Sequence, residues 1–123
     1  MLDVLLIEDD ARIQAALAAR LCAAGLSVRQ SYNGLEGVAQ VKARVPDVIV
    51  LDVRMPGIDG IEVCRQVRMN TRSHKTPVIF LSAETCPRIR EAAIETGGNL
   101  FLEKPYEPAQ LLAAISDVTG VGP

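Results

Sequence analysis

The chain has no apolar stretch that approaches the roughly 20 residues a membrane-spanning helix needs, because its hydrophobic residues occur in short runs. The N-terminus also lacks the basic region and cleavage site of a secretory signal, and residues 2–7 already have the pattern of a strand. We therefore expect a cytoplasmic protein that does not contact a membrane.

Cysteine and histidine are scarce. The three cysteines, Cys22, Cys64 and Cys86, are odd in number and lack the paired spacing of a disulfide framework or a zinc site. We expect free thiols. The one histidine, His74, lies in the polar stretch 70–76, where we expect it to be exposed. A metal site in this chain should therefore use oxygen ligands.

Excess charge of either sign is absent as well. Thirteen Lys and Arg face 15 Asp and Glu, for a formal net charge of -2, and 49% of the residues are hydrophobic. This balance is that of an ordinary globular protein and does not indicate a nucleic-acid partner. At 123 residues the chain is long enough for one domain with a real core. We expect that domain over residues 1–119 and a flexible tail over residues 120–123.

What the chain does have is four apolar runs that each end in polar residues. Residues 5–7 lead into Glu8, Asp9 and Asp10; 48–51 into Asp52; 78–81 into Ser82; and 100–102 into Glu103, Lys104 and Pro105. Such runs, separated by helical patterns, are typical of parallel strands buried on both faces. A weaker pattern over residues 26–32 favours an edge strand. Five alternating strand and helix units predict a doubly wound α/β sheet with right-handed crossovers.

Parallel strands finish at one edge of the sheet, where open α/β folds bind ligands. Glu8, Asp9 and Asp52 should therefore meet there, and such a cluster of like charges needs a cation or retained protons. Oxygen ligands favour Mg²⁺, which is normally held by one or two carboxylates and a phosphate oxygen. Lys104 adds a positive charge, and Ser82 adds a hydroxyl donor. The set describes a site for a phosphoryl group, with Asp52 as the candidate nucleophile.

Each of these residues also has a simpler explanation. Asp10, or less readily Asp9, suits the N-cap of the following helix, and a single Lys104 or Ser82 is more often solvated or part of a turn. Asp52 precedes a Pro-Gly pair typical of a type II turn, so it can be a turn acid. The joint placement of the set at strand ends is what favours a functional site.

Four segments of the sequence resemble the receiver domain of two-component response regulators. They are Leu6-Ile7-Glu8-Asp9-Asp10, the run 51–60 (LDVRMPGIDG), Leu81-Ser82-Ala83-Glu84, and Phe101-Leu102-Glu103-Lys104-Pro105-Tyr106. The likeness extends over nearly the whole chain, with the four motifs in order. It implies a flavodoxin-like fold whose five parallel strands have the order 2-1-3-4-5.

The resemblance also implies roles for individual residues. Asp52 would accept a phosphoryl group from a histidine kinase or phosphotransfer protein. Mg²⁺ would be bound by Asp9 directly, by Glu8 through water, by a side-chain oxygen of Asp52 and by the backbone carbonyl of Arg54. Lys104 would contact the phosphoryl group, and its bond to Pro105 is expected to be cis, which is uncommon for such bonds.

The family further implies a switch. The phosphoryl group would draw Ser82 and Lys104 inward and let Phe101 move, altering partner binding at the face formed by the fourth helix, fifth strand and fifth helix. Many relatives have Tyr in place of Phe101, and Phe lacks the hydroxyl that can report the change. The alternative is a Phe101 packed permanently on its strand.

The sequence argues against one kind of output, a dimer that binds DNA. Relatives that dimerise on DNA often carry an Asp pair before the switch aromatic and a basic last helix, and neither Asn99-Leu100 nor residues 113–116 match. We expect a monomer or weak dimer that does not bind nucleic acid directly.

The expected domain promotes its own modification and turns over no separate substrate. A phosphatase or phosphotransferase with an Asp nucleophile usually needs a second Asp two positions on, where this chain has Arg54. A receiver-like module that works without phosphate is the other alternative. Arg54 and Glu84 flank the site and can form an ion pair. Basic residues around the third helix favour a solvated face; they are Arg65, Arg68, Arg72 and Lys75.

Overall fold

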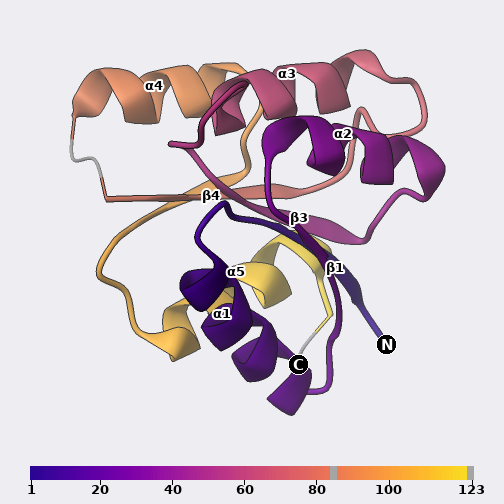
Figure 1. Ribbon diagram of the computed structural model, residues 1–123, viewed down its shortest axis with the longest axis vertical. Coiled ribbons are helices and arrows are strands. Elements are labelled where there is room, and N and C mark those ends of the chain that lie inside the picture. The colour runs from indigo at the N-terminus through magenta and orange to yellow at the C-terminus, as the bar shows by residue number, and fades with distance from the viewer. Residues whose placement is uncertain (84–85, 122–123) are drawn as a thin grey trace.

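Strands and helices alternate along the whole chain in the computed structural model, which describes residues 1–83 and 86–121. Ten elements follow one another along the described residues, and the colours of Figure 1 trace their path from the N-terminus to the C-terminus. Their bounds are β1 Asp3–Ile7, α1 Ala11–Ala23, β2 Ser27–Ser31, α2 Gly34–Ala43, β3 Val48–Asp52, α3 Gly60–Met69, β4 Val78–Ser82, α4 Pro87–Glu95, β5 Leu100–Glu103 and α5 Pro108–Thr119.

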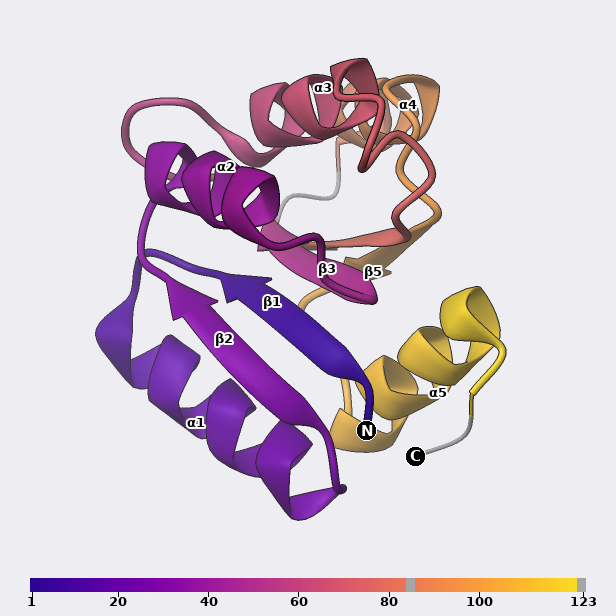
Figure 2. The ribbon, with the colours of Figure 1, turned by 90° about the vertical axis from the view of Figure 1, so that its right-hand side faces the viewer.

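The five strands form one parallel sheet in the order β2-β1-β3-β4-β5, which confirms the predicted fold class. Helices α1 and α5 cover one face of the sheet, and α2, α3 and α4 cover the other (Figure 2). Every residue of β3 and β4 is buried, because both strands are interior and both of their faces are covered. The predicted edge strand is β2, at one end of the sheet.

Two hydrophobic cores lie on the two faces. Alternate side chains of a strand point to opposite faces, so Leu5 and Ile7 join the core under α2, α3 and α4, while Val4 and Leu6 join the core under α1 and α5. Phe80 is fully buried in the first of these cores. A one-residue shift of β1 would exchange its two sets of side chains, so the packing sets the register that places its C-terminal residues.

Helix ends follow local sequence signals. Asp10 is the N-cap of α1, with its side chain accepting hydrogen bonds from the backbone N–H groups of Arg12 (2.8 Å) and Ile13 (3.1 Å). Gly25 follows the helix with a φ of 89°, a left-handed conformation that glycine adopts readily at the end of a helix. Pro108 occupies the first turn of α5, where its missing N–H removes no helical hydrogen bond. Asp10 is therefore the N-cap residue of α1, as one of the two simpler explanations proposed, and the carboxylate of Asp9 is not used as a helix cap.

The prediction of a solvated basic face around α3 is wrong for Arg68. Its guanidinium donates hydrogen bonds to the carbonyls of Thr76 (2.6 Å) and Gly97 (2.7 Å) and to Oδ1 of Asn99 (3.1 Å). Arg68 thus joins α3 to the segments that precede β4 and β5. Charge alone suggested solvation, but five N–H donors in a planar fork also suit several carbonyl oxygens.

Several smaller predictions are confirmed. Cys22, Cys64 and Cys86 are free thiols, and His74 is exposed. Within residues 1–83 and 86–121, no helix is long and apolar enough to span a membrane. Helix α5 ends at Thr119, while residues 122 and 123 of the predicted tail lie outside the described residues. The division into a domain 1–119 and a tail 120–123 stays a prediction.

Candidate functional site

Three carboxylates meet where β1 and β3 end. The two strands are neighbours with Ile7 paired to Leu51, so the residues that follow them emerge side by side. Glu8, Asp9 and Asp52 each have a carboxylate oxygen within 4.8 Å of the others. Glu8 and Asp52 are buried, at 1% and 8% exposure, whereas Asp9 is exposed. The convergence predicted from the sequence is present.

Lys104 brings a positive charge to this cluster. Its Nζ lies 2.8 Å from Oδ2 of Asp52 and 3.8 Å from Oε2 of Glu8. The bond from Lys104 to Pro105 is cis, as the resemblance implied. The backbone N–H of Lys104 donates to the carbonyl of Ser82 at 2.7 Å, so the ends of β4 and β5 are joined beside the cluster. Ser82 itself is 1% exposed.

The position of Glu8 is unfavourable for an ionised carboxyl group. Burial, followed by the neighbouring Asp52 carboxyl, raises the pKa of Glu8 from its ordinary 4.5 to about 8, although the Lys104 charge acts in the opposite direction. Its Oε1 accepts a hydrogen bond from the backbone N–H of Asp10 at 3.1 Å. Its Oε2 is buried without a hydrogen-bond partner among the described residues. A cation, or water bound to a cation, would relieve both conditions.

The donor set fits Mg²⁺. It consists of carboxylate oxygens, and the cluster contains neither His nor Cys, which is the oxygen chemistry that hard divalent ions prefer. One of the three carboxylates is solvent-exposed, which leaves a side open to water, and Mg²⁺ in proteins usually keeps several waters. The buried Oε2 of Glu8, which accepts no hydrogen bond from the described residues, is the observation that most favours an ion here.

The loop between β3 and α3 contacts Asp52 through its backbone. Oδ1 of Asp52 accepts a hydrogen bond from the backbone N–H of Arg54 at 3.2 Å, and Gly57 has a φ of 79°, as the predicted Pro-Gly turn requires. Gly60 begins α3 directly against the end of β3: a Cβ at Gly60 would lie 2.3 Å from the carbonyl oxygen of Asp52. Only glycine permits this close approach, which sets the path of the loop that carries Arg54.

Sequence reasoning missed Gln14. This side chain is fully buried, and its Nε2 donates to the carbonyls of Ser31 (2.8 Å), Leu6 (3.2 Å) and Glu8 (3.2 Å). Gln14 therefore holds the end of β1, which carries Glu8 and Asp9. A signal did exist, because Gln14 lies three and seven residues before Leu17 and Leu21 and so shares the core face of α1. Ile13, which directly precedes it, is 38% exposed and lies off that core face.

Phe101 lies on β5, apart from the carboxylates. It is half-buried, pairs in register with Phe80 and packs against the core of that face. The guanidinium carbon of Arg90 on α4 is 5.9 Å from its ring centroid, and Arg90 also pairs with Glu103 at 3.7 Å. One partner of the predicted Arg54–Glu84 ion pair, Glu84, lies outside the described residues.

The arrangement of acidic cluster, lysine and serine at the sheet edge matches one known family. The sequence profile of the response regulator receiver domain matches residues 4–116. The chain belongs to the response regulator receiver domain family. Response regulator MprA of Mycobacterium leprae (strain TN) is 36% identical over 112 residues, which cover 91% of this chain and 48% of MprA. The chain spans about half the length of the curated relatives it matches.

Solved structures agree with the assignment. Chemotaxis protein CheY4 of Vibrio cholerae has a TM-score of 0.91 and 32% identity, with 96% of this receiver domain and 98% of CheY4 covered. The receiver domain of sensor histidine kinase PA1611 from Pseudomonas aeruginosa PAO1 has a TM-score of 0.91 and 28% identity over 98% of both chains. That structure contains a magnesium ion coordinated in the active site cleft.

Membership in the family sets the broad function. Receiver domains are signalling modules of two-component systems and bind Mg²⁺ at their acidic site. Response regulators receive phosphate from histidine kinases and act on downstream effectors. This receiver domain has an acidic cluster at the ends of β1 and β3.

Proposed function

We propose that this receiver domain takes a phosphoryl group onto Asp52 from a histidine kinase or phosphotransfer protein. The observation that carries the proposal is the contact of 2.8 Å between Lys104 Nζ and Asp52 Oδ2 beside two further carboxylates. A buried Asp with an ammonium on one side and a cation site on the other is arranged for an incoming polyanion. The domain modifies itself and turns over no separate substrate.

Mg²⁺ binding is assigned to Asp9 and Asp52 directly, to Glu8 through water and to the backbone carbonyl of Arg54. The buried Oε2 of Glu8, which accepts no hydrogen bond from the described residues, supports this set of ligands. When bound, Mg²⁺ supplies positive charge that offsets the phosphate oxygens and the crowded carboxylates. The receiver domain's own part is to hold those oxygens together, which Gln14 does at the end of β1.

Transfer forms one bond and breaks one. A carboxylate oxygen of Asp52 attacks phosphorus, while the bond from phosphorus to the histidine nitrogen of the donor breaks and its electron pair stays on that nitrogen. Phosphoryl transfer needs positioning and charge more than further covalent chemistry. Lys104 is placed to pair with the added oxygens, and Ser82, at the end of the adjacent strand, to donate a hydrogen bond.

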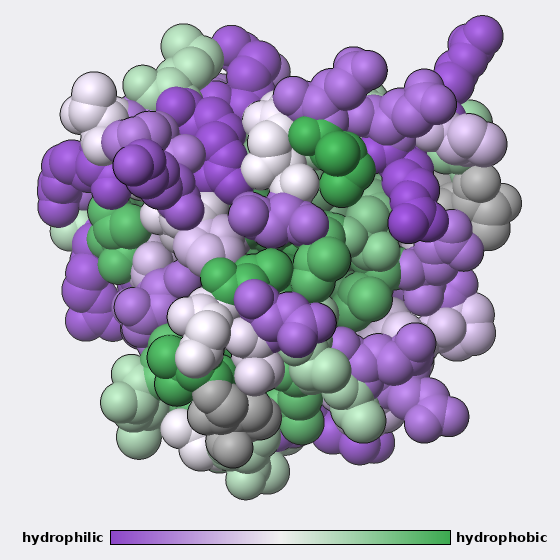
Figure 3. All heavy atoms as spheres, turned by 180° about the vertical axis from the view of Figure 1, so that it is seen from behind, coloured by the Kyte–Doolittle hydropathy of each residue, from purple (hydrophilic) through white to green (hydrophobic). Residues whose placement is uncertain are grey.

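The signal is proposed to leave through the face of α4, β5 and α5. Figure 3, which views the molecule from behind, shows hydrophobic side chains gathered at the centre of one face and hydrophilic ones around them. Leu100, Phe101 and Leu102 of β5 are each half-buried, so this edge strand can change its packing without exposing a core. Ser82 and Phe101 are the proposed switch residues, and the downstream effector binds a monomer or weak dimer.

The test is intact-mass analysis after incubation with Mg²⁺ and a small phosphodonor such as acetyl phosphate. We expect one phosphoryl adduct on the wild-type chain and none on Asp52→Asn or in the presence of a chelator. Asp47→Asn is the matched control, because Asp47 caps the start of β1 through the N–H of Asp3 and lies outside the cluster.

Other results would favour the alternatives. An adduct that persists in Asp52→Asn would place the phosphoryl group elsewhere, and a wild-type chain that never gains mass would favour a module that works without phosphate. Steady release of product from unrelated phosphoesters would indicate an enzyme. The position of Arg54 two residues after Asp52, where such enzymes carry an acid, argues against that last function.

A further inference from the structure

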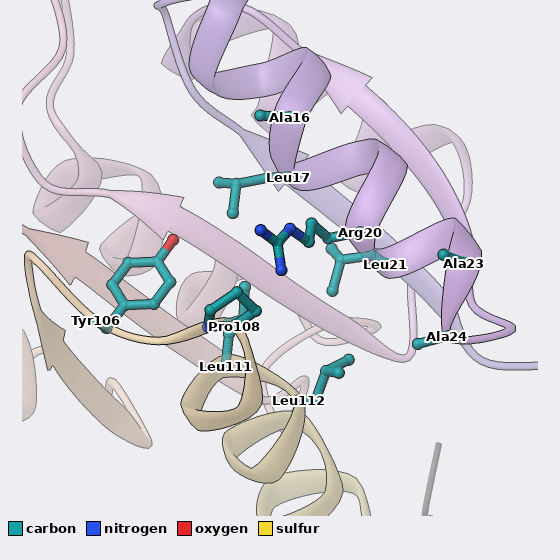
Figure 4. Close-up of a pocket in the computed structure, with 10 residues that line it drawn as sticks. All are labelled: Ala16, Leu17, Arg20, Leu21, Ala23, Ala24, Tyr106, Pro108, Leu111 and Leu112. Carbon is teal, nitrogen blue, oxygen red and sulfur yellow. The ribbon is translucent and has the colours of Figure 1, made fainter.

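A hollow lies between α1 and α5, and none of the three clustered carboxylates lines it. It has a volume of about 460 Å³ and is walled largely by the apolar side chains of Leu17 and Leu21 on one side and Leu111 and Leu112 on the other. Figure 4 shows these side chains facing one another across the hollow. Pockets that bind small molecules usually enclose about 300 to 1,000 Å³ and are mostly apolar with a few polar groups. This hollow has both properties.

Two polar groups stand at its walls. Arg20 extends from α1 over the hollow toward α5 (Figure 4), and in residues 1–83 and 86–121 no carboxylate forms an ion pair with it. Tyr106 lines the other end. Burial and the charges of Glu8 and Asp52 raise the pKa of Tyr106 to about 12, so its hydroxyl stays a neutral donor at neutral pH.

These features define the ligand by complementarity. The apolar walls favour a hydrocarbon or aromatic body, because each buried methylene contributes roughly 0.8 kcal/mol. The one cation, Arg20, favours a single negative charge, and its planar fork suits a carboxylate. We propose that the pocket between α1 and α5 binds a small apolar carboxylic acid, with the carboxylate at Arg20 and the apolar body between the leucines of the two helices.

The experiment titrates the full chain with decanoate below the concentration at which it forms micelles, and follows backbone amide resonances. We expect saturable binding with shifts confined to α1, Tyr106 and α5. Decanol and decylamine, which match decanoate in length, should bind more weakly. Arg20→Gln should weaken decanoate binding about fivefold, which corresponds to about 1 kcal/mol for a partly exposed ion pair.

Two alanines of α1 offer a matched pair of variants. Ala16 lines the hollow and Ala15 does not, and both are exposed. Ala16→Phe should fill the pocket and abolish binding, whereas Ala15→Phe places the same ring on the same helix and should leave the affinity unchanged. Circular dichroism of each variant verifies that the fold is intact, and Arg20→Gln changes only an exposed side chain.

Several results would overturn the proposal. Decanoate that does not bind, that binds Ala16→Phe as tightly as Ala15→Phe, or that binds no more tightly than decylamine would each do so. A sedimentation measurement that shows dimers, with α1 and α5 protected and decanoate excluded, would make a second copy of the chain the occupant. Because binding is measured on the unphosphorylated domain, its outcome is independent of Asp52 modification.

Discussion

At the scale of single residues, Glu8 combines deep burial with a carboxyl group that has few donors. Among residues 1–83 and 86–121, its Oε1 accepts a hydrogen bond and its Oε2 accepts none, and Asp52 lies beside it. Such a group is unfavourable for the fold when it is ionised, because desolvation costs more than one nearby ammonium returns. The acidic site therefore lowers stability in the absence of a cation, as functional sites often do.

The raised pKa of Glu8 predicts how stability depends on pH. The folded chain keeps a proton that the unfolded chain releases between pH 4.5 and about 8, so this contribution is fully present below pH 4.5 and lost as the pH rises to about 8. Without divalent cations, the free energy of unfolding in urea should fall across this range. Glu8→Gln should flatten the fall. Equal slopes for both proteins would show that Glu8 is not the responsible group.

Gln14 predicts a second effect at this scale. Gln14→Leu removes three hydrogen bonds to buried carbonyls, so it should lower the free energy of unfolding by about 1 to 3 kcal/mol. It should also weaken Mg²⁺ binding, since the carbonyl of Glu8 loses its donor. Gln66→Leu is the control, because the one hydrogen bond of that amide within residues 1–83 and 86–121 is to the carboxylate of Glu62. A Gln14→Leu protein as stable as Gln66→Leu would remove the positioning role.

At the scale of elements, β4 and β5 depend on side chains that reach them from α3 and α4. Arg68 crosses from α3 to the segments before β4 and β5, and Arg90 crosses from α4 to Phe101 and Glu103 on β5. Both act on the half of the sheet next to the proposed output face. The two bridges differ in energy, because Arg68 bonds carbonyls at a partly buried position while Arg90 is exposed.

Arg68→Ala should destabilise the protein by about 1 to 3 kcal/mol, because the carbonyls of Thr76 and Gly97 lose a charged donor. The measurement is urea denaturation followed by circular dichroism. Arg72→Ala, which removes the same charge from an exposed side chain with one bond of 3.3 Å, should change stability by no more than about 0.5 kcal/mol. Equal losses would mean that the charge, and not the bridge, matters.

Phe101→Ala should leave phosphorylation of Asp52 intact but largely remove the response of α4, since the ring joins β5 to the core beneath that helix. The readout is the change in α4 amide resonances on phosphorylation. Tyr32→Ala, which removes an aromatic ring that is 44% exposed after β2, is the control. A full α4 response in Phe101→Ala would assign the switch to another residue and leave Phe101 as a packing residue.

At the scale of the whole molecule, binding at the sheet edge couples to global stability. The site joins β1 and β3 at the centre of the sheet, so it exists only in the folded chain. A ligand that binds only the folded state stabilises it by mass action. Binding of a cation to the carboxylates should therefore raise the free energy of unfolding of the entire domain.

Mg²⁺ should raise the free energy of unfolding by about 2.7 kcal/mol when its concentration is a hundred times its dissociation constant. Asp9→Ala should abolish most of the increase without harming the fold, because Asp9 is exposed. Glu91→Ala removes an exposed carboxylate on α4, outside the cluster, and controls for non-specific charge effects. If Asp9→Ala gains as much stability from Mg²⁺ as Glu91→Ala does, the ion binds elsewhere.

Apolar runs and the polar residues that end them were enough to predict the strands, their parallel sheet and the edge where Glu8, Asp9, Asp52 and Lys104 meet. Buried strands need continuous apolar runs, so a polar residue at the end of each run is visible without coordinates. Sheet geometry then forces those ends together. Resemblance to receiver domains added the strand order and the cis bond before Pro105, both of which are present.

Contacts between elements far apart in the sequence became visible in the folded structure alone. Helical spacing predicts that Gln14 faces the core, but it does not predict that the amide donates to three backbone carbonyls. The positive charge of Arg68 is evident from the sequence, but its hydrogen bonds to the segments before β4 and β5 are not. The raised pKa of Glu8 follows from burial, and the pocket under Arg20 from the separation of α1 and α5. The periodicity of a sequence predicts which face of an element a side chain occupies. The partners of that side chain depend on how elements far apart in the sequence pack together.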